Sequence, residues 1–537
     1  LGKPTPCVGR EQELFALEAH LAGCIENSRA SAVLVIGPPG MGKSRLRREF
    51  VHRWQSKADP LATVETLIGQ ADPMASATPY SLLSVGLRRL SGVTGSESPE
   101  DQKLKLKRRL GRNLSRFDAQ QTVEFLAELC GVPLSANPSS AVVAARRDAW
   151  RLQSGILNAF LRFLRAELEI SPIVWILEEL QWADAMSVEL IDVALRELAE
   201  RPFMVLALAR PEVRDIYPRL WGEHRQELVL QGLSRKASER LVRGALKGQI
   251  DGELVNRITE QAAGNPLFLE ELIRASTEGK GDAVPETVLA MLQARLARLA
   301  PEARRILRLA SVYGQTFRLS DIGAFLSNEM DERSLDIWLD VLLSGELIET
   351  VGEGDGPGRG QFHFRHALLR DAAYSLLSNE DQVHAHCLAA RHLEKEGGAA
   401  AQYRWALAAL EKQLDSPQQR RRQVELLLEL VRVSRGREPI DNNLARLTKA
   451  NSLLQSIRGD DAHENDELLE THLRYWSGII NYDGNQMQDA IGHFEAVIEQ
   501  NLRDVGGQNI LMLPASLLGR ALCSREPLPL ACAVVCV

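Results

Sequence analysis

One eight-residue segment combines glycines, a lysine and a serine in a spacing that can bind phosphate. The sequence GPPGMGKS fits the pattern G-x-x-x-x-G-K-[ST] and lies between the apolar run SAVLVI and the charged amphipathic stretch RLRREFVHRWQSK. Glycines let backbone N–H groups face an anion, and the start of a helix adds partial positive charge. We expect Lys43 to neutralise the β- and γ-phosphates and Ser44 to bind Mg²⁺. The predicted nucleotide-binding loop comprises Gly37, Pro38, Pro39, Gly40, Met41, Gly42, Lys43 and Ser44.

Two adjacent acids follow a second apolar run, in IVWILEELQWAD. Glu178 is expected to hold Mg²⁺ together with Ser44, and Glu179 to orient and polarise an attacking water. Paired acids at a strand end are often solvated caps. The phosphate loop upstream favours the catalytic interpretation here.

An arginine and a turn complete the predicted site. Arg210 follows the apolar run FMVLALA, where it could reach the γ-phosphate or lie on the surface. The turn Gly264 to Pro266 could bring Pro266 against the adenine ring, although such turns are common for structural reasons alone.

The composition favours a water-soluble globular chain of several domains. Its 537 residues suggest three or four domains, and 45% hydrophobic with 25% charged residues is near the globular average. A net charge of -7 gives no global positive field for nucleic acid. No signal peptide or apolar stretch of membrane-spanning length is present, and the 7 scattered Cys favour a reducing compartment, so we expect a cytoplasmic protein without membrane contact.

Hydrophobic periodicity predicts four parts along the chain. Apolar runs at SAVLVI, TVETLIG, IVWIL, FMVLALA and ELVLQGL alternate with helical patterns, which predicts a parallel sheet with helices on both faces. A helical insertion carries a basic cluster that we interpret as a solvated face. Helical patterns then precede two short strands around GEGDGPGRG, which is typical of a winged helix. The predicted domains are an α/β P-loop NTPase core at 1–232, an all-α lid at 233–283, a winged-helix domain at 284–395 and a helical, repeat-like region at 396–537.

The last part contains one degenerate tetratricopeptide-like segment. Trp476, Gly478, Tyr482, Ala490 and Phe494 match the large and small positions of paired helices. The final CSREPLPLACAVVCV shows no helical pattern and is interpreted as a frayed or aberrant tail.

Four histidines have spacings that two metal ligands could share. His363, His366, His384 and His386 form HxxH and HxH pairs. No carboxylate or Cys completes a convincing ligand set, so we expect ordinary packing.

These motifs together resemble the STAND class of signal-transducing P-loop ATPases, specifically the bacterial modules attached to serine/threonine kinases, nucleotide cyclases or transcription regulators. The resemblance covers roughly the first 395 residues. It rests on CVGREQEL, GPPGMGKS, LEELQWAD, ALARPEV, AAGNPLFLEELI, PETVLAMLQARLARL and FRHALLRDAAY in that order.

The resemblance implies an AAA-like core, a helical lid, a winged helix and repeats that sense or dock partners. It also implies that Val8, Arg10 and Pro266 border the nucleotide. The family usually carries Asp where this chain has Glu179 and frequently His where it has Gln181, so hydrolysis is less strongly implied than ATP binding.

The leading functional hypothesis is an ATP-binding, slowly hydrolysing signalling switch with ATP and Mg²⁺ as cofactors. The alternatives are a DNA-binding regulator that uses the winged helix and a nucleotide-bound scaffold without turnover. The opening LGKPTPCVGREQEL favours a piece of a longer polypeptide, with any kinase or other signalling domain upstream of Leu1. A protein partner on the C-terminal helices and oligomerisation on activation are further expectations.

Overall fold

The computed structural model divides into two compact units, Leu1–Leu376 and Leu377–Val537. The finer division at 232, 283 and 395 remains a prediction. The tail CSREPLPLACAVVCV and the turn GEGDGPGRG lie outside the described residues. The structure describes residues 7–56, 63–73, 78–93, 97–132, 139–146, 148–246, 252–277, 287–326, 331–350, 361–394, 398–413, 415–436, 438, 440–457 and 464–503.

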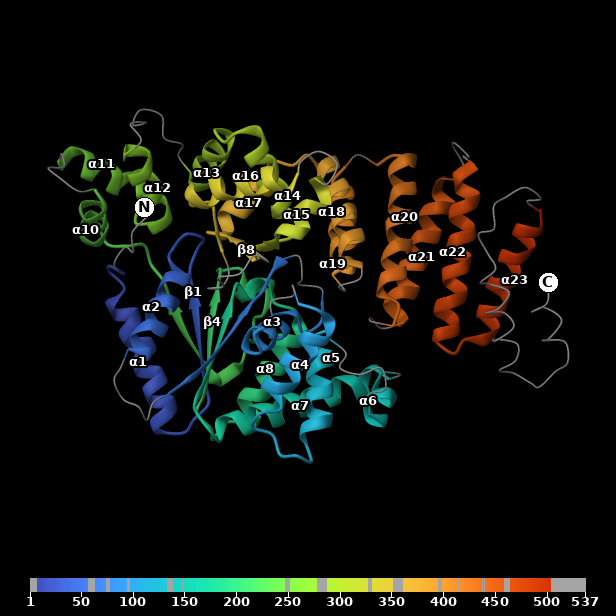
Figure 1. Cartoon of the computed structure of the whole chain (residues 1–537), viewed down its shortest axis with the longest axis horizontal. Helices are drawn as coiled ribbons and strands as arrows, with labels where there is room; N and C mark the ends of the chain where they lie inside the picture. The colour runs from blue at the N-terminus through green and yellow to red at the C-terminus, as the bar shows by residue number, and fades with distance from the viewer. Residues whose placement is uncertain are drawn as a thin grey trace. The chain divides into compact units, whose positions relative to one another are not determined.

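A five-stranded parallel sheet organises the first unit, as the sequence predicted. The strand order is β2-β3-β4-β1-β5, so β4 lies between β1 and β3 (Figure 1). The carboxyl ends of β1, β4 and β3 therefore meet at one edge of the sheet. The strands are β1 (Ser31–Ile36), β2 (Glu65–Gln70), β3 (Ile173–Glu178), β4 (Phe203–Ala209) and β5 (Arg225–Val229).

Helices cover both faces of this sheet, which confirms the predicted α/β class. On one face, α1 (Glu11–Glu26) and α2 (Lys43–Gln55) pack on Val33 and Val35. On the other face, the intervening Leu34 contacts a second core (Figure 1). Successive residues of a strand point to opposite faces, so a strand buried on both sides is apolar throughout. The second core is covered by α3 (Ser81–Leu90), α4 (Pro99–Leu110), α5 (Ala119–Leu129), α6 (Ser140–Ala145), α7 (Ala149–Leu168) and α8 (Ala185–Glu197).

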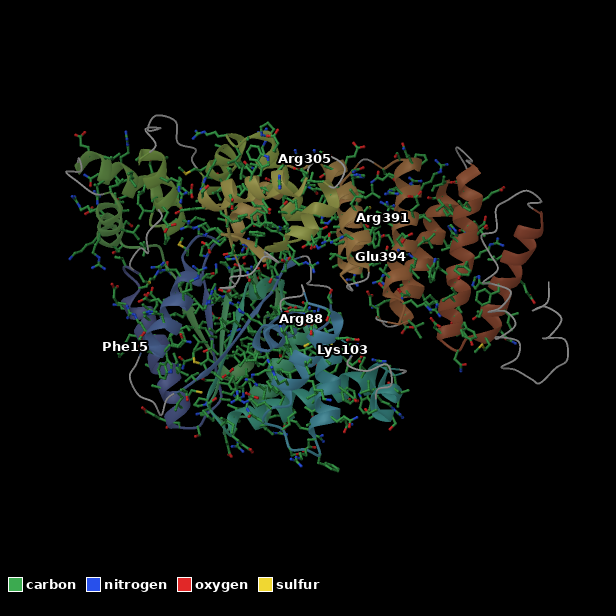
Figure 2. The ribbon with its side chains drawn as sticks, viewed as in Figure 1. Phe15, Arg88, Lys103, Arg305, Arg391 and Glu394 are labelled. Atoms are coloured by element: carbon green, nitrogen blue, oxygen red, sulfur yellow. The ribbon has the colours of Figure 1, made fainter. Side chains whose placement is uncertain are left out.

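The basic cluster of the insertion lies on α4 and is partly neutralised within the fold. Arg109 donates to Glu167 at 2.8 and 2.9 Å and to Glu65 at 3.1 Å. Lys105 pairs with Glu97, whereas Lys103, labelled in Figure 2, is partly exposed. The cluster is not one uniform basic surface.

A small helical bundle follows the sheet. It contains α10 (Arg235–Ala245), α11 (Gly252–Ala262) and α12 (Pro266–Thr277), which pack around Val255, Ile258 and Leu269. These are the elements expected of the lid.

The remainder of the first unit has the elements expected of a winged helix. The two predicted strands are present as β7 and β8, and a third strand, β6, was not predicted. The antiparallel order is β6-β8-β7, and Phe317 of β6 stacks on Phe362 of β8. The elements are α13 (Val288–Ala297), α14 (Pro301–Val312), β6 (Thr316–Arg318), α15 (Leu319–Leu326), α16 (Glu332–Ser344), β7 (Ile348–Thr350), β8 (Gln361–Phe364) and α17 (Ala367–Ser375).

The second unit is helical throughout its described residues. The predicted helix pair is present as α22 and α23, where Phe494 packs beside Gly478 and Ala490 is buried; its assignment as a tetratricopeptide repeat stays a prediction. None of the helices in the described ranges of the chain is long and apolar enough to cross a membrane. The helices of this unit are α18 (Asn379–Leu393), α19 (Ala399–Leu410), α20 (Pro417–Ser434), α21 (Ile440–Ile457), α22 (Glu464–Asp483) and α23 (Met487–Arg503).

Candidate functional site

The glycine-rich loop joins β1 to α2 and has the backbone that the motif requires. Gly40 and Gly42 have φ values of +82° and +85°, in the left-handed region that favours glycine. A Cβ on Gly40 would lie 2.7 Å from Asn265 Oδ1. The loop therefore needs glycine both for its turns and for close packing against the lid.

Five consecutive carbonyl groups of the loop accept hydrogen bonds. Lys43 Nζ donates to the oxygens of Gly37 at 2.7 Å and Pro38 at 3.2 Å. Three donors from outside the loop bind the next carbonyls. They are Asn265 Nδ2 to Pro39 O at 3.2 Å, the Leu267 N–H to Gly40 O at 3.2 Å, and Arg10 Nη2 to Met41 O at 3.1 Å.

Several N–H groups of the same loop, unlike its carbonyl groups, take no part in hydrogen bonds with the described residues. Within the described part of the chain, those of Gly40, Gly42 and Ser44 have no hydrogen-bond acceptor. Ser44 also lies in the first turn of α2, where helical N–H groups lack an intrahelical partner. The carbonyl groups of the loop are thus hydrogen-bonded within the fold, while three of its N–H groups are left without acceptors in the described ranges. Such free N–H groups form a site that fits a phosphate chain.

The side chain of Lys43, near the end of this loop, has acidic and basic neighbours. Its side chain is buried, and desolvation lowers its pKa, while the charge of Glu179 opposes the shift and that of Arg210 adds to it. Glu179 and Arg210 follow β3 and β4, so the sheet brings three predicted site residues together.

Glu178 faces the helix that follows the loop. Its Oε1 atom lies 3.3 Å from Nε of Arg47. Arg47 is three residues after Ser44, so both side chains lie on neighbouring positions of one helical face. Glu178 and Ser44, the predicted Mg²⁺ ligands, are thus directed to the same side of α2.

Glu179 belongs to a network at the end of β3. Its backbone is left-handed, with φ of 54°. Gln181 Nε2 donates to Glu179 Oε2 at 2.5 Å, and Gln181 Oε1 accepts from the Arg210 N–H at 2.9 Å. Arg210 Nε lies 3.5 Å from the same Glu179 oxygen. Gln181 thus holds the acid of one strand beside the arginine of the next.

Comparison with protein families agrees with this geometry. Residues 6–206, which include β1 to β3, α2 and the acidic pair, match the family described as AAA ATPase domain. Residues 6–206 form an AAA ATPase domain. The predicted AAA-like P-loop core is confirmed.

One relative of this chain extends well beyond the ATPase domain. An uncharacterized protein of Rhizobium meliloti (strain 1021) is 25% identical over 393 residues, which is 70% of this chain and 36% of that protein. The chain thus spans about a third of that relative's length.

Two solved structures show weaker similarity to the fold. One is a Signal Transduction ATPase with Numerous Domains protein with a tetratricopeptide repeat sensor from Pyrococcus horikoshii, at 15% identity over 97% of this chain and 74% of that chain, with a TM-score of 0.38. The other is Cdc6p from Pyrobaculum aerophilum, at 13% identity over 70% of this chain and 96% of that chain, with a TM-score of 0.32.

The three residues assigned by resemblance lie around the loop of the ATPase domain. Arg10 is buried and joins Met41 to Glu13. Pro266 begins α12, and a Cβ on Gly42 would lie 3.9 Å from its ring. Val8 packs with Leu233 and Ala237 of the lid. Arg10 and Pro266 border the loop directly, whereas the observed contacts of Val8 are with lid residues.

Asp184, the last residue of the LEELQWAD motif, is occupied by structural hydrogen bonds. Its carboxylate accepts from the Tyr80 N–H at 2.7 Å and from the Ser187 N–H and hydroxyl at 2.8 and 2.7 Å. Ser81 and Leu82 also donate to it. Asp184 therefore joins the starts of α3 and α8, which explains its place in the motif without catalysis.

The histidines lie in separate environments. His363 Nε2 is 3.2 Å from Glu349, and His386 bonds to Gln402 at 2.6 Å. His366 precedes α17 and His384 is exposed on α18. Among the described residues, no group of three or more His, Cys, Asp or Glu side chains could hold a metal ion.

Three residues of the site were not assigned by the sequence analysis. Arg47, Gln181 and Asn265 bind Glu178, Glu179 and Pro39, respectively. Gln181 lies in the motif LEELQWAD and Asn265 in AAGNPLFLEELI, so these two motifs could have identified both residues as part of the site. Arg47 lies in a generally basic helix, and nothing distinguishes it from Arg45 or Arg48 before folding.

Proposed function

We propose that the chain is an ATP-binding, slowly hydrolysing switch of the STAND class. The hydrogen bonding of the loop carries the proposal. Five carbonyls from Gly37 to Met41 are satisfied within the fold, while the N–H groups of Gly40, Gly42 and Ser44 remain for an anion. Triphosphate is the anion that this motif and the AAA ATPase family favour.

The remaining site residues support distinct roles in ATP binding and hydrolysis. Ser44 and Glu178 would hold Mg²⁺, which would supply charge neutralisation for the phosphate oxygens. Lys43, whose Nζ donates to the Gly37 and Pro38 oxygens in the structure, would turn from them to the β- and γ-phosphates when nucleotide binds. Glu179 would accept hydrogen bonding from the attacking water and take its proton. Arg210, beside Glu179, would stabilise charge that develops on the γ-phosphate.

Contacts between the loop and the lid support a switching function. Asn265 and Leu267 of the lid bind carbonyls of the loop, and Pro266 lies between them. A nucleotide touched by both the loop and Pro266 would favour the arrangement in which they meet. A ligand can shift a conformational equilibrium only through such differential contact.

The wider role is proposed from the family resemblance. The ATPase would regulate a catalytic or signalling domain of a larger bacterial protein, such as a serine/threonine kinase. The C-terminal helices would dock a protein partner, and activation would include oligomerisation. We place this activity in the cytoplasm.

DNA binding by the winged-helix elements is less well supported. The helix that precedes β7, α16, exposes Asp336 and Asp340 together with Ile337 and Val341. Carboxylates on that surface would repel the phosphate backbone that a major-groove helix must approach.

Titration calorimetry with a magnesium-ATP analogue tests the proposal. Lys43→Ala should weaken binding by about ten- to a hundredfold, because charge-assisted hydrogen bonds are worth about 1.5 to 3 kcal/mol. Arg53→Ala provides the control, since it removes a cation from the far end of α2 where Arg53 pairs with Glu49. Equal affinity in wild type and Lys43→Ala would remove the loop as the nucleotide site.

A further inference from the structure

The second unit contains a cavity that is independent of the ATPase site. It has a volume of about 180 Å³ and is lined by residues of α18, α19, α20 and α22. Pockets for drug-sized ligands usually span about 300 to 1,000 Å³. This cavity therefore suits a smaller molecule, of metabolite size.

Part of the cavity wall is apolar. Leu426 of α20 and Leu469 of α22 line it, and both are largely removed from solvent. Cys387 of α18 lines it as well, and burial raises the pKa of its thiol, so that the sulfur is neutral near pH 7. The apolar part of a ligand can contact this part of the wall without burying an unpaired polar group of the protein.

The acidic residues of the wall already have basic partners. Glu425 accepts from Arg422, which also donates to Cys387 Sγ at 3.7 Å. Glu429 pairs with Arg432. Both carboxylates are therefore partly neutralised within the fold.

Arg391 is a further cation on the cavity wall. It lines the cavity from the last turn of α18 and is exposed to solvent. No hydrogen bond or ion pair of Arg391 is found among the described residues, but its charge lowers the pKa of the neighbouring Glu394. Glu394, which follows α18 and is labelled with Arg391 in Figure 2, is bound by Arg432. The acidic residues of the cavity wall are paired with other arginines. The guanidinium of Arg391 can therefore offer two parallel N–H donors to the carboxylate of a ligand.

We propose that this cavity binds a small organic monocarboxylate. The carboxylate pairs with Arg391, and the apolar body lies against Leu426 and Leu469. Tyr403, whose hydroxyl is 3.5 Å from Glu394 Oε1, provides a polar group on the wall for a ligand substituent. The unit that follows the ATPase thus carries its own small-molecule input site. The binding itself does not depend on the function proposed for the ATPase.

Ligand-observed fluorine NMR on the full chain, with 4-fluorobenzoate as the probe, tests this site. We expect saturable binding, at least about tenfold weaker binding to Arg391→Gln, and partial recovery in Arg391→Lys, which keeps the charge but loses the planar fork. Lys412→Gln is the matched control, because it removes one positive charge from an exposed position after α19 and does not line the cavity. It should bind as wild type does.

Competition and neutral analogues define the ligand class. The neutral 4-fluorobenzamide should bind at least about tenfold more weakly, and inorganic phosphate should not compete at equal concentration. Absence of 4-fluorobenzoate binding, or equal binding by Arg391→Gln, would overturn the site. Equal binding of the amide, or equal competition by phosphate, would overturn the assignment to an apolar carboxylate. Since none of these measurements involves ATP, their failure would be distinct from failure of the ATPase proposal.

Discussion

Arg210 Nη2 lies 3.6 Å from Asp371 Oδ2, while Nε of the same guanidinium lies 3.5 Å from Glu179 Oε2. One arginine thus contacts the acid predicted to activate water and a carboxylate on α17. Asp371 also pairs with Arg370 at 3.1 Å. Movement of α17 away from the sheet would leave Arg210 with Glu179 alone. This geometry joins α17 to two residues of the predicted catalytic site.

Asp371→Asn should release nucleotide faster than wild type, because it removes a charged contact between α17 and Arg210. The contact is partly exposed, and such pairs are worth about 0.2 to 1 kcal/mol, which corresponds to at most about a fivefold change in rate. Stopped-flow release of a fluorescent ADP analogue measures it. Asp336→Asn, which neutralises an exposed acid on α16, should leave the rate unchanged. Identical rates in all three proteins would show that Asp371 does not restrain the site.

Glu179→Gln should retain ATP binding and lose hydrolysis. The amide keeps the shape and hydrogen-bonding reach of the carboxylate but cannot accept a proton from water. Wild-type turnover itself should be below the ~1 to 100 per second typical of kinases. Single-turnover phosphate release at matched nucleotide occupancy gives both values. Equal rates in the two proteins would assign the catalytic role elsewhere, with Glu178 as the next residue to replace.

Gly478→Ala should destabilise the second unit by about 1 to 3 kcal/mol, the usual cost of overpacking. An added Cβ would lie 2.5 to 2.9 Å from three atoms of the Phe494 ring. Gly492 of α23 is the matched control, since a Cβ there meets nothing within 4 Å. Gly492→Ala should stabilise the helix by about 0.5 to 1 kcal/mol. Urea unfolding followed by circular dichroism should move the two midpoints in opposite directions, and a shared direction would contradict the packing of α22 on α23.

His366 should make the first unit less stable in acid. Desolvation, with the charge of Arg365, lowers its pKa to about 4 from 6.5, so the folded state holds the imidazole neutral. The contribution of the neutral His366 to the free energy of unfolding is present above about pH 6.5. It is lost as the pH falls toward 4, at up to about 1.4 kcal/mol per pH unit. Urea midpoints at pH 7 and pH 5 should differ less in His366→Asn than in wild type. The exposed His384→Asn should behave as wild type, and an unchanged pH dependence in His366→Asn would place the titrating group elsewhere.

Much of the fold follows from local pattern. The five apolar runs overlap the five strands of the parallel sheet. Burial on both faces explains the continuous apolar sequence of β1, β3 and β4, whereas β2 and β5 lie at the edges of the sheet and are less buried. Strand β6 was missed because its three residues, Thr316–Arg318, carry too little periodicity to distinguish them from a loop. Its place depends on pairing with β8, 43 or more residues further on in the chain.

Within the site, the sequence alone determined which residues can bind phosphate. The spacing of Gly40, Gly42, Lys43 and Ser44 is a local property, since the turn and the helix start both lie within eight residues. Tertiary structure decided what surrounds them. Strand order brings Arg210 beside Glu179, and lid packing brings Asn265 onto Pro39, 226 residues away. Chain folding alone sets such distances, because hydrogen bonds and ion pairs act over a few ångströms and leave no periodic trace in the sequence between their partners.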